Sequence, residues 1–401
     1  MVKIKKNEYY KAQILNLIYN KQLISRIRIG EMTGIRLATI TEIVRILIKE
    51  GLVKETGKIR NRQGVGRKEK ILEIIPEGKF FIGCELRPCE IQTLLLNFKG
   101  EIVHTELCSI TPEQKSDEVL VNIKSIINLL IKKVGIPYKK IYGMGFVDPG
   151  VIDVEKGISI SSTIMPSWKD VPVRKYLEQE LRFRVFLINT PQAKVLAEHL
   201  FGKGRGINDL VFIEYGEGIA CGIISDGRPI GGYMEIAGEM GHFNFPGREE
   251  KCRCGNKGCL ETIASIPSIE KRIRKFVMDK NRHPFKDSAS IEDIVCAFER
   301  GEPLAVEVLN DVSDILGIAV GNVVKLLNPE VVVFDRNFKR MGNKFINRVF
   351  NNVKKNIISS EKIKFKISDM GKEQGALGGA ALTLQNFLKK TAKFEIPMYP
   401  I

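Results

Sequence analysis

Histidine and tryptophan are scarce in this chain, and long apolar runs are missing. Only 4 histidines and 1 tryptophan occur in 401 residues. No apolar run approaches the roughly 20 residues that a membrane-spanning helix needs, and the N-terminus carries no secretion-signal pattern. The 8 cysteines lack the spacing of a secreted disulfide framework, and no solenoid-length repeat is present. These absences argue against membrane, secreted and repeat proteins, and we expect a cytoplasmic protein with reduced thiols.

Positive charge is concentrated near the N-terminus. Residues 1–80 contain 18 Lys and Arg against 8 Asp and Glu, so they carry +10 of the formal net charge of +16. Charge gathered in one small region is typical of nucleic-acid binding. A bias in base composition that enriches Lys and Ile is the alternative explanation. The uneven distribution favours DNA as a partner of this region.

The first eighty residues show the pattern of a helix-turn-helix. Apolar residues recur at helical spacing in residues 9–19 and 38–50, and Ser25 is a suitable N-cap for a short helix that ends near Gly34. The glycine-bearing turn 32–35 is typical of the sharp corner before a recognition helix. We therefore predict that the third helix enters the major groove of DNA.

Two short strands, 52–53 and 71–74, flank a basic loop and predict a wing. The loop GKIRNRQGVGRKEK combines glycines with guanidinium groups that suit phosphates or a narrow minor groove. A helical dimerisation or docking module with a solvated loop is the alternative, because fold does not fix function.

Glu42 also lies on the outward face of the third helix. The predicted DNA contacts are Arg36, Thr39, Thr41, Arg45, Arg60, Arg62, Arg67 and Lys68.

One histidine and three cysteines lie within eighteen residues, in the segment GEMGHFNFPGREEKCRCGNKGCLE. Zn²⁺ binds imidazole nitrogen and thiolate sulfur as a tetrahedron, and four protein ligands leave no position for a catalytic water. Packing cysteines or a stray disulfide are the alternative, but the surrounding charged and glycine residues disfavour burial. The predicted ligands of a structural Zn²⁺ ion are His242, Cys252, Cys254 and Cys259. Two acids, Glu239 and Glu261, flank this site.

From residue 80 onward, strand patterns alternate with helix patterns. Strands are predicted at 80–86, 91–97, 101–109, 141–147, 185–188, 210–213, 220–225 and 331–334, and helices at 119–134 and 315–327. Such alternation predicts an α/β fold with helices layered on a mixed sheet. Residues 278–292 form a polar segment that we expect on the surface.

Several motifs resemble those of the ROK family, which is named for repressors, open reading frames and kinases. They are TGIRLATITEIVRILIKEGLV, GMGFVDPGVID, VFLINTPQAKVLAEHLFG, and IAGEMGH followed by CRCGNKGCLE. The resemblance covers nearly the whole chain and points to repressors of the xylose and N-acetylglucosamine type. It implies an N-terminal winged helix-turn-helix followed by a two-lobed, actin- or hexokinase-like domain.

The resemblance also implies the domain boundaries and the sugar-binding residues. Residues 1–78 would bind DNA, 79–190 would form a first lobe completed by a helix near 375–390, and 191–374 would form a second lobe with the zinc loop and a dimerisation surface. In sugar-binding members, the matching residues that contact the sugar are Asn189, Glu239, His242 and Glu261. Amide and carboxylate groups suit paired sugar hydroxyls. Ile164-Met165-Pro166 stands where relatives often have an asparagine, which favours a pentose or a less polar sugar.

Four features that ROK kinases use to handle ATP are altered. Thr190 stands where the kinases have a catalytic aspartate. The first phosphate loop reads Glu85-Leu86-Arg87-Pro88-Cys89, and Asp335-Arg336 replaces a later glycine pair. Glu217 adds an acid to a third loop. Because proline has no amide hydrogen and side chains hinder close approach, the sequence predicts a degenerate ATP site and no enzyme activity.

Together these features predict a sugar-responsive repressor of carbohydrate-utilisation genes. It would bind two-fold symmetric, double-stranded operator DNA as a homodimer, with a tetramer also open. A small sugar effector would change lobe closure and thereby DNA affinity. The alternatives are an ATP-dependent sugar kinase with an attached DNA-binding domain, and a metal-stabilised scaffold without either activity. The sequence leaves open the sugar, the operator, and whether the effector releases or promotes DNA binding.

Overall fold

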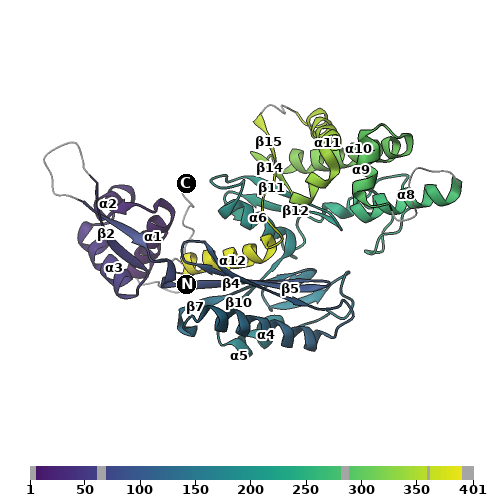
Figure 1. The fold of residues 1–401 in the computed structure, drawn as a ribbon. Coiled ribbons are helices and arrows are strands. Elements are labelled where there is room, and N and C mark those ends of the chain that lie inside the picture. Colours follow the sequence, from purple (N-terminus) through teal and green to yellow (C-terminus); the bar gives the residue numbers. More distant parts are fainter. Residues whose placement is uncertain (1–5, 61–68, 281–288, 359–361, 391–401) are drawn as a thin grey trace. The chain divides into compact units, whose positions relative to one another are not determined.

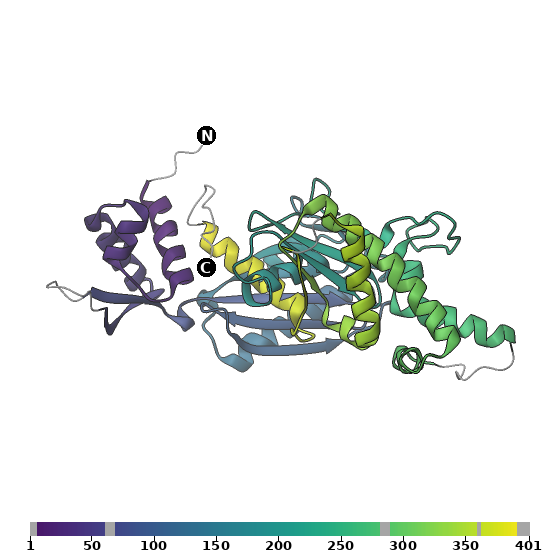
Figure 2. The same ribbon diagram turned by 90° about the horizontal axis from the view of Figure 1, so that it is seen from above.

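The chain folds into two compact units. The computed structural model describes residues 6–60, 69–280, 289–358 and 362–390 (Figure 1, Figure 2). One unit comprises Met1–Ala193 and Gly375–Ile401, and the other comprises Lys194–Gln374. Across the described ranges, no helix is both long and apolar enough to cross a bilayer. The finer division into three domains stays a prediction.

The first unit begins with the predicted helix-turn-helix. Its helices are α1 (Lys6–Lys21), α2 (Arg26–Thr33) and α3 (Leu37–Lys49). The Ser25 hydroxyl accepts a hydrogen bond from the Arg28 amide and caps α2, and Gly34 ends this helix with a φ of 68°. Both residues act as the sequence predicts, because a short polar side chain and a glycine favour these positions. Arg36 precedes α3 without a side-chain cap.

Apolar side chains from α1 and α3 and a small sheet complete this region. The buried residues of the two helices include Ile14, Leu15, Ile18, Ile40, Ile43, Val44 and Leu47. Strands β1 (Ile24–Ser25), β2 (Val53–Arg60) and β3 (Glu69–Ile74) form an antiparallel sheet in the order β1-β3-β2. The β2–β3 pair follows α3 at the place predicted for a wing, and the intervening residues 61–68 lie outside the described part.

A five-stranded sheet forms the centre of the rest of the first unit. Its strands are β4 (Phe80–Arg87), β5 (Glu90–Asn97), β6 (Ile102–Ser109), β7 (Ile141–Asp148) and β10 (Arg184–Asn189). The spatial order is β10-β7-β4-β5-β6. β4, β5 and β6 form an antiparallel meander, whereas β7 and β10 run parallel to β4. All five strands overlap predicted ones. The short strands β8 (Val151–Asp153) and β9 (Ile158–Ser161) pair separately.

Helices cover both faces of this sheet (Figure 1). α4 (Ser116–Val134) and α5 (Val173–Leu181) lie on one face, and α12 (Gln374–Lys390) lies on the other. α4 agrees with the helix predicted at 119–134, and its apolar face is buried. α12 thus brings the C-terminal part of the chain back onto the first sheet.

α12 lies directly on the backbone of two strands. A Cβ atom at Gly83 of β4 would lie 1.7 Å from the carbonyl oxygen of Ala376, and one at Gly145 of β7 would lie 1.9 Å from that of Gly379. Both distances are far shorter than van der Waals contact, so these positions accept only glycine in this packing. The close approach also places the first turn of α12 against the end of β4.

The second unit contains another five-stranded sheet. Its strands are β11 (Leu210–Tyr215), β12 (Ile219–Ser225), β13 (Arg228–Pro229), β14 (Val331–Phe334) and β15 (Lys364–Ile367). They follow the order β13-β12-β11-β14-β15, with β12 antiparallel and β14 parallel to β11. The predicted strands at 210–213, 220–225 and 331–334 are confirmed.

The helices of this region depart further from the sequence-based expectation. α6 (Thr190–Phe201) begins in the first unit and continues into the second. The others are α7 (Leu260–Ala264), α8 (Ile266–Lys280), α9 (Ile291–Glu299), α10 (Pro303–Leu327) and α11 (Gly342–Asn356). α10 begins at Pro303 and not at Ile315, because the Glu302 side chain accepts from the Ala305 amide and proline suits the first turn. The polar segment 278–292 begins inside α8 and ends inside α9, and 281–288 lie outside the described residues.

Gly145→Ala should destabilise the protein by about 3 kcal/mol or more, because the new methyl group meets backbone that no rotamer change can move. The free energy of unfolding, measured by urea titration with circular dichroism, tests this. Gly57→Ala is the matched control, since no atom lies within 4 Å of a Cβ added there. Equal stability of Gly145→Ala and wild type would contradict the close approach of α12.

Candidate functional site

The predicted metal ligands come together in the second unit. One nitrogen of His242 and the sulfurs of Cys252, Cys254 and Cys259 all lie within 4.8 Å of one another. The Cys252 Sγ is 3.6 Å from the His242 Nδ1, and the Cys254 Sγ is 3.7 Å from the Cys259 Sγ. Metal bonds of about 2.1–2.3 Å would place tetrahedral ligand atoms about 3.4–3.8 Å apart. Both of these distances agree with a tetrahedral metal site, and the four side chains are close enough together to hold one metal ion.

Tight turns build this cluster from local sequence. The Cys252 amide donates to the Asn256 carbonyl at 2.8 Å, which closes the turn that carries Cys254. Gly258 has a φ of 68°, and a Cβ atom there would lie 2.7 Å from the Arg248 carbonyl oxygen. A glycine is required at this position because both the backbone conformation and the space exclude a side chain. Cys259 follows at once and precedes α7.

Burial makes the thiolate form costly without a cation. It raises the pKa of the Cys259 thiol to about 12 and also raises the pKa of Cys252. The Asn256 amide lowers the pKa of the exposed Cys254 thiol. Since metals bind thiolates, metal binding at this cluster would release protons and depend on pH.

Two of the predicted sugar-binding residues lie against the metal cluster. The Nδ1 atom of His242 faces Cys252, so Nε2 is the free edge of the ring, and it lies 3.7 Å from the Glu239 Oε2. Burial raises the pKa of Glu239, and the negative charge of Glu261 adds to this effect. The Glu239 carboxylate therefore lies on the side of the His242 ring opposite the cysteines. Carboxylates in this position commonly orient histidine ligands of metals.

Glu261 lies in the first turn of α7, two residues after Cys259. A Cβ atom at Gly218 would lie 2.9 Å from the Glu261 Oε2, so this carboxylate rests against the loop between β11 and β12. The Arg253 guanidinium is 3.9 Å from its other oxygen. The second unit therefore gathers three of the four predicted sugar-binding residues around one loop.

Asn189, the fourth of these residues, ends β10 in the first unit. Its side-chain oxygen accepts from the Gln192 amide at 3.1 Å, which orients the side chain at the start of α6. Its partner in the sheet register is Asp148 at the end of β7. Met165, from the segment predicted to make the sugar site less polar, is buried in the core of this unit.

Asp148 is a buried carboxylate that the sequence analysis did not single out. One oxygen accepts from the Trp168 indole at 3.0 Å, and the other accepts from the Gly150 amide at 2.8 Å. Burial raises the pKa of Asp148 to about 6, against the opposing effect of these hydrogen bonds. An acid that ends an apolar strand, directly before Pro149-Gly150, was the available signal.

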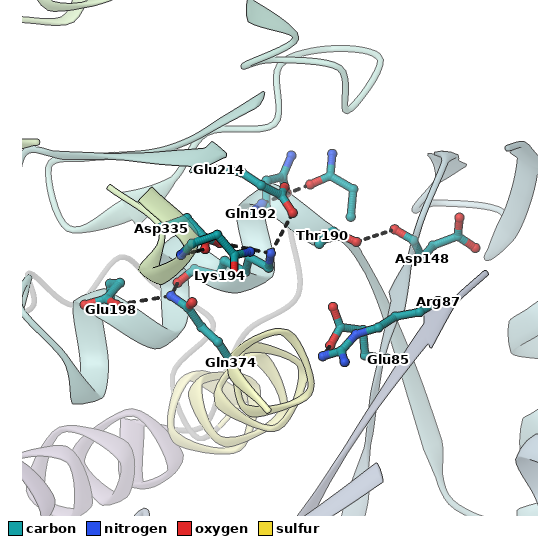
Figure 3. Close-up of polar contacts among 12 residues, drawn as sticks. Glu85, Arg87, Asp148, Thr190, Gln192, Lys194, Glu198, Glu214, Asp335 and Gln374 are labelled. Atoms are coloured by element: carbon teal, nitrogen blue, oxygen red, sulfur yellow. Dashed lines mark hydrogen bonds and ion pairs between the residues drawn. The ribbon is translucent and has the colours of Figure 1, made fainter. Parts of the chain in front are cut away.

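The altered phosphate loops hold charges that pair within each unit (Figure 3). In the first unit, Arg87 donates to the buried Glu85 at 2.5 Å, and a Cβ atom at Gly375 would lie 2.2 Å from the same carboxylate. The Glu85 carboxylate thus lies on the first turn of α12, where the helix dipole favours an anion. Thr190 donates its hydroxyl proton to the Asp148 carbonyl at 3.3 Å.

In the second unit, Lys194 links two acids. Its Nζ is 2.6 Å from the Glu214 Oε1 and 3.3 Å from the Asp335 Oδ2 (Figure 3). Asp335 also accepts from the Asn337 amide at 2.8 Å. This carboxylate and its lysine therefore lie where the resemblance implies a glycine pair in the kinases.

The predicted DNA contacts on α3 lie at its outer surface. Arg36 and Arg45 are exposed, and Thr39 and Thr41 are half-buried. The Thr41 hydroxyl donates to the Leu37 carbonyl at 2.8 Å, so its methyl group and its acceptor lone pair remain for a partner. Arg60 ends β2, and its side chain lies outside the described part, as do Arg62, Arg67 and Lys68.

Each unit contains a five-stranded α/β sheet, and the first also contains the N-terminal winged helix-turn-helix. This combination is the fold of actin- and hexokinase-like proteins with an added helix-turn-helix domain. The sequence model of the ROK family matches residues 82–386. The chain therefore belongs to the ROK family, as its motifs indicate.

Repressors are similar to this chain over most of its length. The xylose repressor of Caldicellulosiruptor bescii is 27% identical over 385 residues, which cover 94% of this chain and 96% of that protein. The DNA-binding transcriptional dual regulator NagC of Escherichia coli strain K12 is 29% identical over 331 residues, covering 80% of this chain and 79% of the regulator.

Solved structures of a regulator and of a kinase are both similar to this chain. A ROK family transcriptional regulator described as a homolog of the Escherichia coli MLC protein matches with a TM-score of 0.83 and 27% identity, over 95% of this chain and 96% of that one. The ROK hexokinase of Thermus thermophilus has a TM-score of 0.67 and 24% identity, and covers 78% of this chain and 99% of its own. The kinase likeness concerns the fold alone.

We expect the purified protein to bind about one divalent metal ion per chain, and Cys254→Ser to lose most of it, because one tetrahedral ligand is gone. Elemental analysis after dialysis measures this content. Cys296→Ser is the matched control, since Cys296 is an exposed cysteine outside the cluster. Equal metal content in the two variants would argue against the cluster as the binding site.

The emission of Trp168, the single tryptophan, should titrate with a midpoint near pH 6, because its indole donates to Asp148. The pKa of Asp148 in the folded protein lies above its ordinary value of 3.8. Its contribution to the free energy of unfolding is therefore fully present below pH 3.8 and is lost as the pH rises through about 6. Fluorescence spectra across pH test this, with Asp148→Asn as the control that removes the titration. A variant that titrates like wild type would rule out Asp148 as the titrating group.

Proposed function

We propose that this chain is a sugar-responsive transcriptional repressor of the ROK family. One observation carries the proposal: the similarity to the xylose repressor and to the transcriptional regulator structure covers 94% and 95% of this chain. The family model begins at residue 82, so that similarity extends into the winged helix-turn-helix that precedes it. A repressor of carbohydrate-utilisation genes acts where its operator lies, in the cytoplasm.

The DNA contacts follow from the geometry of a helix-turn-helix. α3 would lie in the major groove with Arg36, Thr39, Thr41 and Arg45, and the basic loop with Arg60, Arg62, Arg67 and Lys68 would contact the adjacent backbone. A two-fold symmetric operator would require a homodimer, with a tetramer as a further assembly. The second unit, 191–374 in the predicted division, would supply the dimerisation surface.

A small sugar would be the effector, held by Asn189, Glu239, His242 and Glu261. The amide offers both a donor and an acceptor, and the carboxylates accept paired hydroxyl groups. The names of the relatives favour xylose or N-acetylglucosamine chemistry. Any response requires that the sugar binds the DNA-competent and DNA-incompetent states with different affinities.

Zn²⁺ would be the metal at His242, Cys252, Cys254 and Cys259, and its role would be structural. Imidazole and thiolate ligands in a tetrahedron suit Zn²⁺, and four protein ligands leave no position for a reacting water. A bound ion would neutralise the thiolates and fix the ring of His242. The Nε2 edge of that ring would then be held toward Glu239 and the sugar.

Phosphate transfer is not part of the proposed function. The Glu85 carboxylate lies against the first turn of α12, and Asp335 with Lys194 would fill a second phosphate position. Thr190 replaces the aspartate of the kinases and has no useful basicity near neutral pH. These contacts support a degenerate ATP site.

Binding of the purified protein to its own upstream promoter DNA tests the proposal. We expect a retarded complex in a gel-shift assay, and one pentose, hexose or amino sugar of a panel should change its affinity. Arg45→Ala should weaken the complex by about tenfold, the size of one base or phosphate contact, whereas Arg300→Ala, an exposed arginine on the second unit, should not.

The other outcomes separate the alternatives. A complex that no sugar affects would favour a constitutive regulator or a metal-stabilised scaffold. Absence of any complex, together with transfer of phosphate from ATP to a sugar of the panel, would favour the kinase.

A further inference from the structure

The recognition helix has one face that its own domain leaves uncovered. Buried residues of α3 lie on one side, at Ile40, Ile43, Val44 and Leu47. Residues spaced i, i+4, i+7 and i+11 occupy the opposite side and are exposed: Ala38, Glu42, Arg45 and Lys49. Under the proposed function, on which this inference rests, that side meets the edges of the bases.

Glu42 differs from the other acids near this face. Glu50 pairs with Lys11 at 2.5 Å, Glu55 with Arg26 at 2.5 Å, and Glu31 with Arg28 at 2.9 Å. Within the described ranges, Glu42 has neither an ion pair nor a side-chain hydrogen bond. Its carboxylate therefore points to solvent from the middle of a surface that otherwise carries Arg45 and Lys49.

A carboxylate at this position weakens DNA binding by electrostatic repulsion unless a base donates a hydrogen bond to it. Phosphates repel it, and so do the acceptors that guanine and thymine present in the major groove, O6, N7 and O4. Only the exocyclic amino groups of cytosine and adenine donate there, and cytosine shows the amino group without a neighbouring acceptor. A glutamate thus distinguishes bases by their amino group.

We propose that Glu42 determines operator specificity by accepting a hydrogen bond from the amino group of a cytosine at one position of each half-site. Ala38 lies one turn before Glu42 on the same face. Its small methyl side chain would let the helix approach the bases closely enough for Glu42 to reach them. Arg45, one turn after Glu42, is placed to contact a neighbouring base or phosphate.

Selection of the full-length protein and its Glu42→Gln variant on random-sequence duplexes tests the proposal. An amide can donate and accept together, which suits the N6 and N7 atoms of adenine. We expect one position of each half-site to change from cytosine toward adenine, with the other positions unchanged. On the wild-type site, Glu42→Gln should lose about tenfold in affinity, the size of one base contact.

Glu8→Gln is the matched control, because it removes the same charge from an exposed position of α1 in the same domain. It should leave the selected sequence unchanged. Glu42→Ala, checked for folding by circular dichroism, should relax the preference at the same position without creating a new one.

Other results would overturn the proposal. If Glu42→Gln binds every sequence more tightly by one factor, the carboxylate only repels phosphates. If selection returns the same sequence for both proteins, Glu42 does not read a base. If wild-type protein selects no sequence and binds no duplex, it is the proposed DNA-binding function that fails.

Discussion

The packing of α12 on two glycines, Gly83 and Gly145, determines how the C-terminal helix joins the first sheet. α12 follows the second unit in the chain, yet it packs on the first sheet, so its packing site must be specific. Gly83 and Gly145 form that packing site, because a side chain at either position would clash with the helix backbone. Small residues on both partners allow the helix backbone to pack directly on the strand backbone. The same packing brings the first turn of α12 onto Glu85.

The metal loop applies a second constraint, and it acts through the two nitrogens of one ring. If Nδ1 of His242 is fixed by the cysteine cluster, Nε2 has only one direction left, and Glu239 lies along it. A ligand that bonds to Glu239 would then contact a group whose orientation a bound metal would influence. Glu261 is tied to the same loop from the other side, because it follows Cys259 in the chain. A metal bound at this cluster would therefore help to position all three side chains, and its removal would disturb them together.

Local signals made the N-terminal fold and the clustering of His242 with the three cysteines predictable. Ser25 and Gly34 act within one helix, and the cysteines lie close enough in sequence for their spacing to be informative. The start of α10 was also encoded, in Glu302 and Pro303, but the apolar run beginning at Ile315 gave the stronger signal. Contacts between distant residues could not be found this way. Trp168 meets Asp148 across 20 positions and Lys194 meets Asp335 across 141, and only the packed sheets bring these pairs together.

The segment that resembles the first phosphate loop of the kinases holds a carboxylate beside the start of a helix. The first turn of a helix favours an anion. At α12 the Glu85 carboxylate, which is paired with Arg87, lies against Gly375 in that turn. An external phosphate would have to displace a carboxylate held at a high effective concentration, and would then leave Arg87 without its buried partner. Under the proposed function, Glu85 would hinder phosphate binding at the start of α12, and the sugar would be the ligand to which the protein responds.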